Sequence, residues 1–187
     1  MINKKNKDFI FKAAILTQLK KKLLISNIKF NHKLSRGQVL IKMYYSGICG
    51  SQIGEINGVK GKDNFLPHLL GHEGSGIIIN KNNFVKKFKI GDRVILHWQK
   101  GDGHDSSCPT YLMDKKKINA GRVTTFNEFA VVSENRITKI PKGLSEKNAV
   151  IFGCALTTGF GAVVNDAKVK NNKSILIFGA GGIGISI

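Results

Sequence analysis

Two cysteines and one histidine stand in sequence surroundings that suit a metal site. Cys49 lies in SGICGS after an alternating apolar segment, His72 lies in GHEG, and Cys154 follows Gly153 where a helix is expected to begin. Each alone would suit an ordinary role, since isolated cysteines usually pack in the core. Together, two thiolates and one imidazole leave the fourth position of a tetrahedral zinc ion open, which is the ligand set of a catalytic site and not of a closed structural one.

A glycine run near residue 180 has the spacing of a phosphate-binding turn. Gly179, Gly181 and Gly184 form G-x-G-x-x-G directly after the apolar residues 174–178. That spacing lets the backbone approach a pyrophosphate at the start of a helix. A glycine-rich turn without a ligand is the alternative.

Short apolar or alternating segments surround the candidate ligands. The strands that they predict are residues 12–16, 23–29, 37–45, 76–80, 89–96, 126–132 and 137–140. Strands of this length and spacing indicate a barrel-like β domain. Residues 46–64 are expected to form a loop with a short helix. Residues 100–122, which are polar and basic without periodicity, are expected to form a long loop or lobe.

The sequence changes character near Ser145. Residues 146–164 are rich in alanine and glycine and predict a helix with breaks at Gly153 and at residues 159–161. Residues 174–178 predict a strand that runs into the glycine turn and opens a β-α-β unit. We therefore expect two domains, with a mainly β domain at 1–144. Residues 145–187 would supply the helix, first strand and glycine turn of a truncated nucleotide-binding domain.

The composition narrows the classes of function. The net charge of +18 is spread along the chain as lysines, with no basic block interleaved with aromatic residues, so we expect no nucleic-acid partner. No apolar run approaches the ~20 residues of a membrane helix, and Lys12 interrupts the first apolar run, so we expect neither a membrane span nor a signal peptide. Three cysteines give no disulfide framework and favour a reducing cytoplasm.

These motifs together resemble the zinc-containing medium-chain dehydrogenases, the alcohol dehydrogenase superfamily. The matching pieces occur in the family's order and span nearly the whole chain. They are GQVLIKMYYSGICGS, LPHLLGHEGSG, KIGDRVIL, TFNEFAVVSENRITKIP, GCALTTGFGA and ILIFGAGGIG. The GHE sequence with the upstream cysteine is the most specific of them, whereas the glycine run alone would be weak.

The resemblance implies a role for several residues. Cys49, His72 and Cys154 would bind a catalytic zinc ion, and Glu73 would approach the metal during ligand exchange. Ser51 would take the proton of the alcohol substrate, although a serine that caps the following helix is the alternative. Family members with a relay histidine carry it where this chain has Gly54. Trp98 would wall the substrate cleft, with a plain core tryptophan as the alternative.

The resemblance also implies a fold and an activity. The expected fold is a GroES-like, partly open β-barrel followed by the start of a Rossmann α/β domain. The expected function is that of a zinc-dependent alcohol dehydrogenase (EC 1.1.1.-), which transfers a hydride between an alcohol or aldehyde and NAD or NADP. The full-length form is expected to be a homo-oligomer, and this chain, which looks truncated, is expected to be inactive alone.

Three alternatives bear on that expectation. A non-catalytic zinc-binding GroES-like module remains open, and the truncation favours it for this polypeptide. A zinc-free relative resembling quinone reductases is disfavoured because Cys49 and His72 are both present. Many family members bind a second, structural zinc through four closely spaced cysteines, but residues 98–121 contain only Cys108. We therefore expect one zinc ion per chain.

Overall fold

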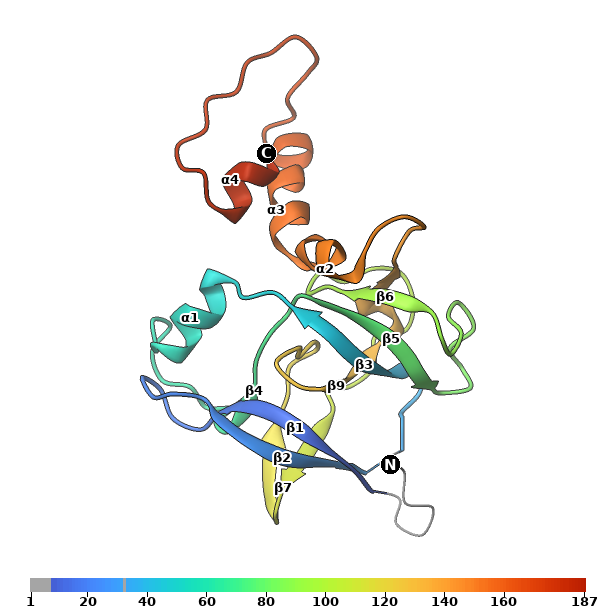
Figure 1. Cartoon of the computed structure of the whole chain (residues 1–187). Helices are drawn as coiled ribbons and strands as arrows, with labels where there is room; N and C mark the ends of the chain where they lie inside the picture. Colours follow the sequence, from blue (N-terminus) through green and yellow to red (C-terminus); the bar gives the residue numbers. More distant parts are fainter. Residues whose placement is uncertain (1–7, 32) are drawn as a thin grey trace.

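The computed structural model describes residues 8–31 and 33–187 and contains two β-sheets. The first closes into a barrel through the pairing of β4 with β1 (Figure 1). In spatial order, its strands are β1 (Asp8–Leu16), β2 (Leu24–Asn31), β7 (Thr110–Met113), β8 (Lys116–Asn119) and β4 (His68–Leu69). Residues 1–7, which begin the segment expected to carry no signal peptide, lie outside the described residues.

The second sheet carries the segments that lead into the candidate metal ligands. In spatial order, its strands are β10 (Ile137–Lys139), β6 (Arg93–Leu96), β5 (Gly74–Lys81), β3 (Gln38–Ser46) and β9 (Phe129–Ser133). Strands β3 and β5 are antiparallel and pair Ser46 with Gly74, so the chain that leaves β3 runs beside the chain that enters β5. The expected mainly β, barrel-like GroES fold is confirmed.

The prediction of a loop or lobe at 100–122 was wrong, because this segment contains the hairpin of β7 and β8. The turn between them places Asp114 at a φ of +54°. Tyr111 of β7 and Ile118 of β8 are buried in the barrel, and Met113 of β7 packs against the same cluster. Lysines occupy most positions around Ile118, and they concealed the alternation that would have indicated a strand.

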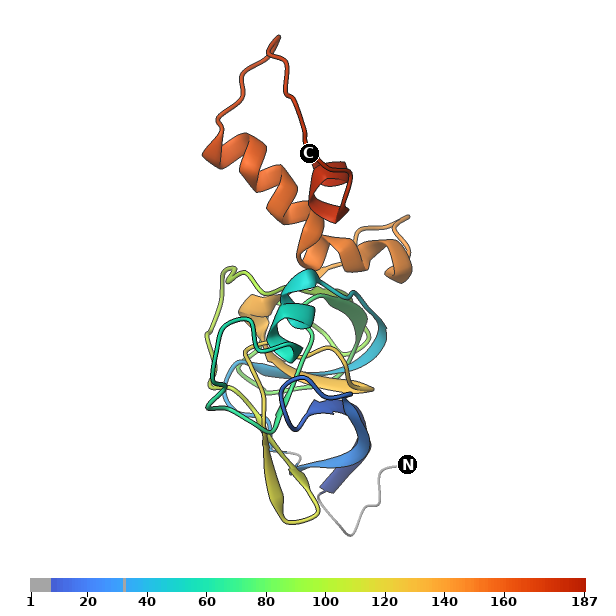
Figure 2. The same ribbon diagram turned by 90° about the vertical axis from the view of Figure 1, so that its left-hand side faces the viewer.

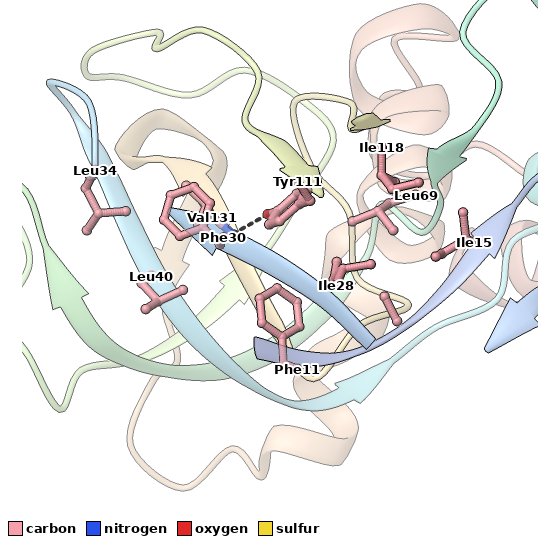
Figure 3. Close-up of a cluster of buried hydrophobic side chains, with 11 residues drawn as sticks. Phe11, Ile15, Ile28, Phe30, Leu34, Leu40, Leu69, Tyr111, Ile118 and Val131 are labelled. Carbon is pink, nitrogen blue, oxygen red and sulfur yellow. Dashed lines mark hydrogen bonds between the residues drawn. The ribbon is translucent and has the colours of Figure 1, made fainter. Parts of the chain in front are cut away.

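An apolar cluster fills the barrel and fixes the position of this hairpin (Figure 3). Tyr111 packs edge-on against Phe11, with ring centroids 5.8 Å apart, and its hydroxyl accepts a hydrogen bond from the backbone N–H of Val131 at 3.3 Å. Phe30 and Ile28 of β2 close the same cluster. Burial of these side chains provides the main stabilisation of the barrel.

The described helices are short. They are α1 (Gly50–Ile56), α2 (Glu146–Ala149), α3 (Ala155–Gly161) and α4 (Gly182–Ser186), with 3₁₀ turns at Glu134–Arg136 and Val150–Gly153 and a π turn at Ala162–Asp166. Ser145 caps α2 by accepting the N–H of Asn148. Arg93 of β6 forms a 2.6 Å ion pair with Glu146, which holds α2 against the second sheet.

The predicted helical region differs from expectation in one respect. A break does occur between Gly153 and Cys154, but α3 runs through Gly159 and ends at Gly161, where the π turn begins. A Cβ at Gly159 would lie 2.7 Å from Cβ of Ser186 in α4. The glycine therefore serves the close contact between α3 and α4 and does not end the helix.

The strand predicted at 174–178 was also wrong: this segment forms no strand and is exposed, with Phe178 at 91%. An apolar strand of a parallel sheet needs neighbours on both edges and faces, and the described residues place none there. Both views show α3 and α4 projecting from the end of the β-sheets (Figure 1, Figure 2).

Among the described helices, none is long and apolar enough by itself to cross a membrane. One bent pair, Glu146–Gly153 with Ala155–Asp166, passes that test by length and composition.

Because β7 is part of the barrel, we expect substitutions of its inward and outward side chains to differ in their effect on stability. Tyr111→Ala should lower the free energy of unfolding by about 3–5 kcal/mol, because it empties the barrel core. Leu112→Ala is the matched control: Leu112 is 39% exposed on the same strand, and we expect a loss below about 1 kcal/mol. Urea denaturation checks both values, and equal losses would contradict the inward placement of Tyr111.

Candidate metal centre

Cys49 lies at the amino-terminal cap of α1, in an extended conformation with φ −98° and ψ 148°. Its backbone N–H donates to Oε1 of Gln52 at 2.9 Å, three residues further along the helix. This hydrogen bond between a cap residue and the third helical residue fixes the first turn. The start of α1 therefore determines where the Cys49 thiol lies.

His72 lies in the turn between β4 and β5. Gly71 precedes it with φ +89°, and a Cβ at this glycine would lie 2.3 Å from Oγ1 of Thr125. Only glycine meets both requirements, because the left-handed conformation and the close contact each disfavour a side chain. The glycine thus allows the chain to turn tightly against residues 125–126, and this turn sets the position of His72.

Cys154 lies at the break between the 3₁₀ turn Val150–Gly153 and α3, and its φ of −149° and ψ of −69° fall outside the helical region. A Cβ at the preceding Gly153 would lie 2.5 Å from the carbonyl oxygen of Leu96 and 2.6 Å from Cβ of Glu73. The absence of a side chain at residue 153 therefore lets the Cys154 segment rest directly on β6 and on Glu73.

The three side chains converge on one point. One ligand atom from each of Cys49, His72 and Cys154 lies within 4.8 Å of the others, and the two sulfurs are 4.0 Å apart. Two sulfurs at ~2.3 Å from a tetrahedral ion would be ~3.8 Å apart, whereas a disulfide needs ~2.05 Å. The separation therefore matches a shared metal ion and not a disulfide.

The protonation states of His72 and Cys154 bear on whether this cluster can bind a cation. Burial lowers the pKa of His72 and so favours the neutral imidazole, which is the form that binds metals. Burial, then Cys49 and Glu73, raise the pKa of Cys154 to about 11. A divalent cation reverses such a shift, because it deprotonates a coordinating thiol. Cysteine sulfur and histidine nitrogen are also the donors that zinc prefers, so the residues present fit that ion.

Gln52 is a site residue that sequence reasoning did not identify. Its side chain is 2% exposed, and its amide forms a short hydrogen bond with Nδ1 of His72. The Gln52 side-chain nitrogen is the donor of this hydrogen bond and Nδ1 is the acceptor, and the contact orients the His72 ring. A glutamine three residues after the cap was a usable signal, since that spacing is typical of a capping box.

Three further residues were predicted to act at this site, namely Glu73, Ser51 and Trp98. Glu73 is buried, and its carboxylate accepts the N–H of Ala155, which opposes the rise in its pKa that burial causes. Ser51 is exposed in the first turn of α1, and its hydroxyl accepts a 3.4 Å hydrogen bond from the Gln52 amide. Trp98 is 44% exposed after β6 and does not line the cavity at Cys154, so its predicted substrate role stays a prediction.

The glycine run faces the metal cluster across a shared cavity of about 540 Å³. Cys49, Glu73 and Cys154 line one side, and Gly179, Gly181 and Gly184 line the other. A Cβ at Gly184 would lie 2.0 Å from the carbonyl oxygen of Gly179, so the turn itself requires that glycine. Two motifs more than 100 residues apart in the sequence therefore border the same space.

The loop cysteine stands apart from this arrangement. Cys108 is exposed and free, and within residues 8–31 and 33–187 it joins no group of metal-binding side chains.

Comparison with known proteins places the fold in one family. Residues 35–142 match the family model described as the alcohol dehydrogenase GroES-like domain. This match covers more than half of the chain, from β3 to β10. The chain belongs to the alcohol dehydrogenase GroES-like domain family.

Relatives of known name and structure support this membership. Alcohol dehydrogenase 6 of Peromyscus maniculatus is 32% identical over 80% of this chain and 46% of its own length. S-(hydroxymethyl)glutathione dehydrogenase of Synechocystis is 29% identical over 94% of this chain and 54% of its own length. An alcohol dehydrogenase zinc-binding domain protein from Burkholderia ambifaria matches the fold with a TM-score of 0.83 at 24% identity, covering 96% of this chain and 55% of that structure. The chain spans about half the length of the curated relatives that it matches.

The contact at Gly153 predicts a steric effect that is separate from metal binding. Gly153→Ala should lower the free energy of unfolding by about 1–3 kcal/mol, because the added methyl meets backbone that cannot move away. Gly161→Ala in α3 is the control, since the nearest atom to its Cβ would be 3.8 Å away, and alanine favours a helix there. Denaturation in the presence of a chelator checks both, and a neutral Gly153→Ala would contradict the close contact.

Proposed function

We propose that this chain is the metal-carrying part of a zinc-dependent alcohol dehydrogenase that transfers a hydride between an alcohol or aldehyde and NAD or NADP. The observation that carries the proposal is the shared cavity, which has two cysteines on one wall and the glycine run on the other. Several relatives are named alcohol dehydrogenases or S-(hydroxymethyl)glutathione dehydrogenases, which supports the same class of reaction.

Cys49, His72 and Cys154 would hold the zinc ion. When bound, zinc supplies a Lewis acid that lowers the pKa of a hydroxyl ligand toward neutrality. Three protein donors leave one coordination position for the substrate. The Gln52 amide would keep the His72 ring oriented, and Glu73, which packs beneath Cys154, would approach the metal when ligands exchange.

Ser51 would receive the proton of the substrate hydroxyl and pass it towards solvent. Its place in the first turn of α1, two residues after Cys49, and its exposure support this role. Gly54 offers no side chain for a further relay, so the proton would leave through the ribose of the cofactor or through water. The nicotinamide cofactor, when bound, would accept the hydride that the alcohol loses together with this proton.

Gly179, Gly181 and Gly184 would accept the pyrophosphate of the dinucleotide. The positive φ of Gly179 and the close contact at Gly184 form the tight turn that such binding needs.

The domain division and assembly follow the same proposal. Residues 1–144 would form the zinc-carrying domain, and residues from 145, where Ser145 caps α2, would begin the nucleotide-binding domain. The exposed side chains of Leu176 and Phe178 are apolar surface for the rest of that domain to cover. The whole protein would be a homo-oligomer, and its free cysteines suit the cytoplasm.

Zinc content tests the ligand set. We expect mass spectrometry to find one tightly bound zinc ion in the parent and none in Cys49→Ser or His72→Ala, because neither replacement supplies the missing donor. Cys108→Ser should keep it. Retention of tight zinc by either ligand variant would refute the assignment.

Turnover tests the chemistry. In the protein with its complete nucleotide-binding domain, Ser51→Ala should lower kcat on the order of 10²-fold, the usual contribution of a positioned proton acceptor. Ser51→Thr, which keeps the hydroxyl, should remain active. The measurement is nicotinamide absorbance with primary, secondary and polyol alcohols and aldehydes. Inactivity of the zinc-loaded parent on all of them would favour the non-catalytic zinc module.

A further inference from the structure

A second group of metal-binding side chains lies outside the cysteine cluster. Glu55, Asp63 and His68 each turn one ligand atom to a common point, and these atoms lie within 4.8 Å of one another. Glu55 belongs to the last turn of α1, Asp63 to the following loop and His68 to β4. The side chains of Asp63 and His68 are 12% and 8% exposed, so the group is largely sheltered from solvent on the side of β4.

The histidine is oriented as a ligand would be. Nδ1 of His68 donates to the carbonyl oxygen of Leu69 at 2.9 Å, which turns Nε2 towards the carboxylates. Nε2 lies 2.8 Å from Oδ2 of Asp63 and 3.8 Å from Oε1 of Glu55. A backbone carbonyl that holds one ring nitrogen while the other faces acidic side chains is the usual arrangement around metal-ligating histidines.

Within residues 8–31 and 33–187, the two carboxylates share a single cationic partner, His68. Oδ1 of Asp63 accepts the N–H of Phe65 at 2.8 Å, and Oδ2 lies 2.8 Å from Nε2 of His68. Burial would raise the pKa of Asp63, but this N–H and His68 outweigh it and keep the pKa low, so the carboxylate is charged. Across residues 8–31 and 33–187, Glu55 contacts no charged or hydrogen-bonding partner except His68.

Other cationic side chains lie close to these two carboxylates. The chain has 30 lysines and arginines, and Lys60 and Lys62 line the hollow beside Glu55 and Asp63. In the part of the chain that the structure describes, neither lysine forms an ion pair with either carboxylate. Two negative groups this close repel each other unless a positive charge lies between them.

We propose that Glu55, Asp63 and His68 bind a divalent transition-metal ion, such as Zn²⁺ or Mn²⁺, at a site separate from the cysteine cluster. One imidazole nitrogen and two carboxylate oxygens are donors that suit both ions, whereas thiolates select softer metals. Water fills the remaining positions from a cavity of about 210 Å³ that Glu55 and His68 line together with Gln52 and His72. This adds a second ion to the single zinc expected from the sequence.

The second ion has a defined structural consequence. It joins the end of α1 to β4, while the start of α1 carries Cys49 and β4 leads to His72. Glu55 follows Gln52 by one helical turn, and His72 follows His68 by four residues. The ion therefore adds a link between the two segments that supply the first two proposed zinc donors.

The test uses Mn²⁺, whose free ion gives an electron paramagnetic resonance signal that is lost on binding. The chain is first loaded with one equivalent of Zn²⁺, which fills the thiolate site, and is then titrated with Mn²⁺. We expect about one Mn²⁺ per chain, with binding at least about tenfold weaker in Glu55→Gln and in Asp63→Asn. Glu134→Gln, whose carboxylate lies far along the chain and accepts only the His104 N–H, is the control and should bind like the parent.

Further measurements exclude a merely structural Asp63–His68 pair. Saturating Mn²⁺ should raise the Tm of the parent and of Cys49→Ser, but not that of Glu55→Gln, which is partly exposed at 41% and should fold normally. Absence of Mn²⁺ binding by the parent, or equal binding by Glu55→Gln and Asp63→Asn, would overturn the proposal. Loss of the Mn²⁺ site in Cys49→Ser would place the ion at the thiolates and would also overturn it.

Discussion

The structure depends on the packing of one buried glutamate between two glycines. A Cβ at Gly47 would lie 2.7 Å from the side chain of Glu73, and a Cβ at Gly153 would lie 2.6 Å from its Cβ. The N–H of Gly47 also donates to the carbonyl oxygen of Glu73 at 3.1 Å. Three segments far apart in the sequence therefore meet at Glu73, and each carries one of the proposed metal ligands within two residues of this contact.

This contact explains why a β-barrel family can present a metal site at the edge of its sheets. The antiparallel pairing of β3 with β5 delivers Gly47 and Glu73 together, and α2, anchored by Arg93, delivers Gly153 from the other side. Backbone hydrogen bonds and core packing thus set the geometry, and the ligands themselves add little constraint. An arrangement held in this way keeps its donors close together without a metal ion.

Much of this could be predicted from the sequence, for identifiable reasons. Strand β3 alternates and was predicted over nearly its whole length, β1 was predicted only from residue 12, and the motifs around Cys49 and His72 are specific. The hairpin of β7 and β8 could not be predicted, because each strand has four residues and fully buries a single large side chain, Tyr111 or Ile118. Residues 174–178 have a strand's composition but lack the neighbouring strands that composition presupposes.

The same limits apply to the sites. The three proposed zinc donors could be named from the sequence because each lies in a recognisable motif. Glu55 and Asp63 lie in no such motif, and only the fold shows that α1 and β4 face each other. A histidine and two carboxylates spread over 14 residues have no spacing that indicates a ligand set.

The cavity between the cysteines and the glycine run has walls of unequal mutational freedom. Gly47 and Gly153, which adjoin the lining residues Ile48 and Cys154, leave no room for a side chain beside Glu73. On the same rim, Ile48 is 75% exposed, and Ile183 across the cavity is 48% exposed. Such positions can exchange one apolar side chain for another without moving Glu73. Evolution can therefore reshape what enters this cavity while it leaves the metal-binding frame unchanged.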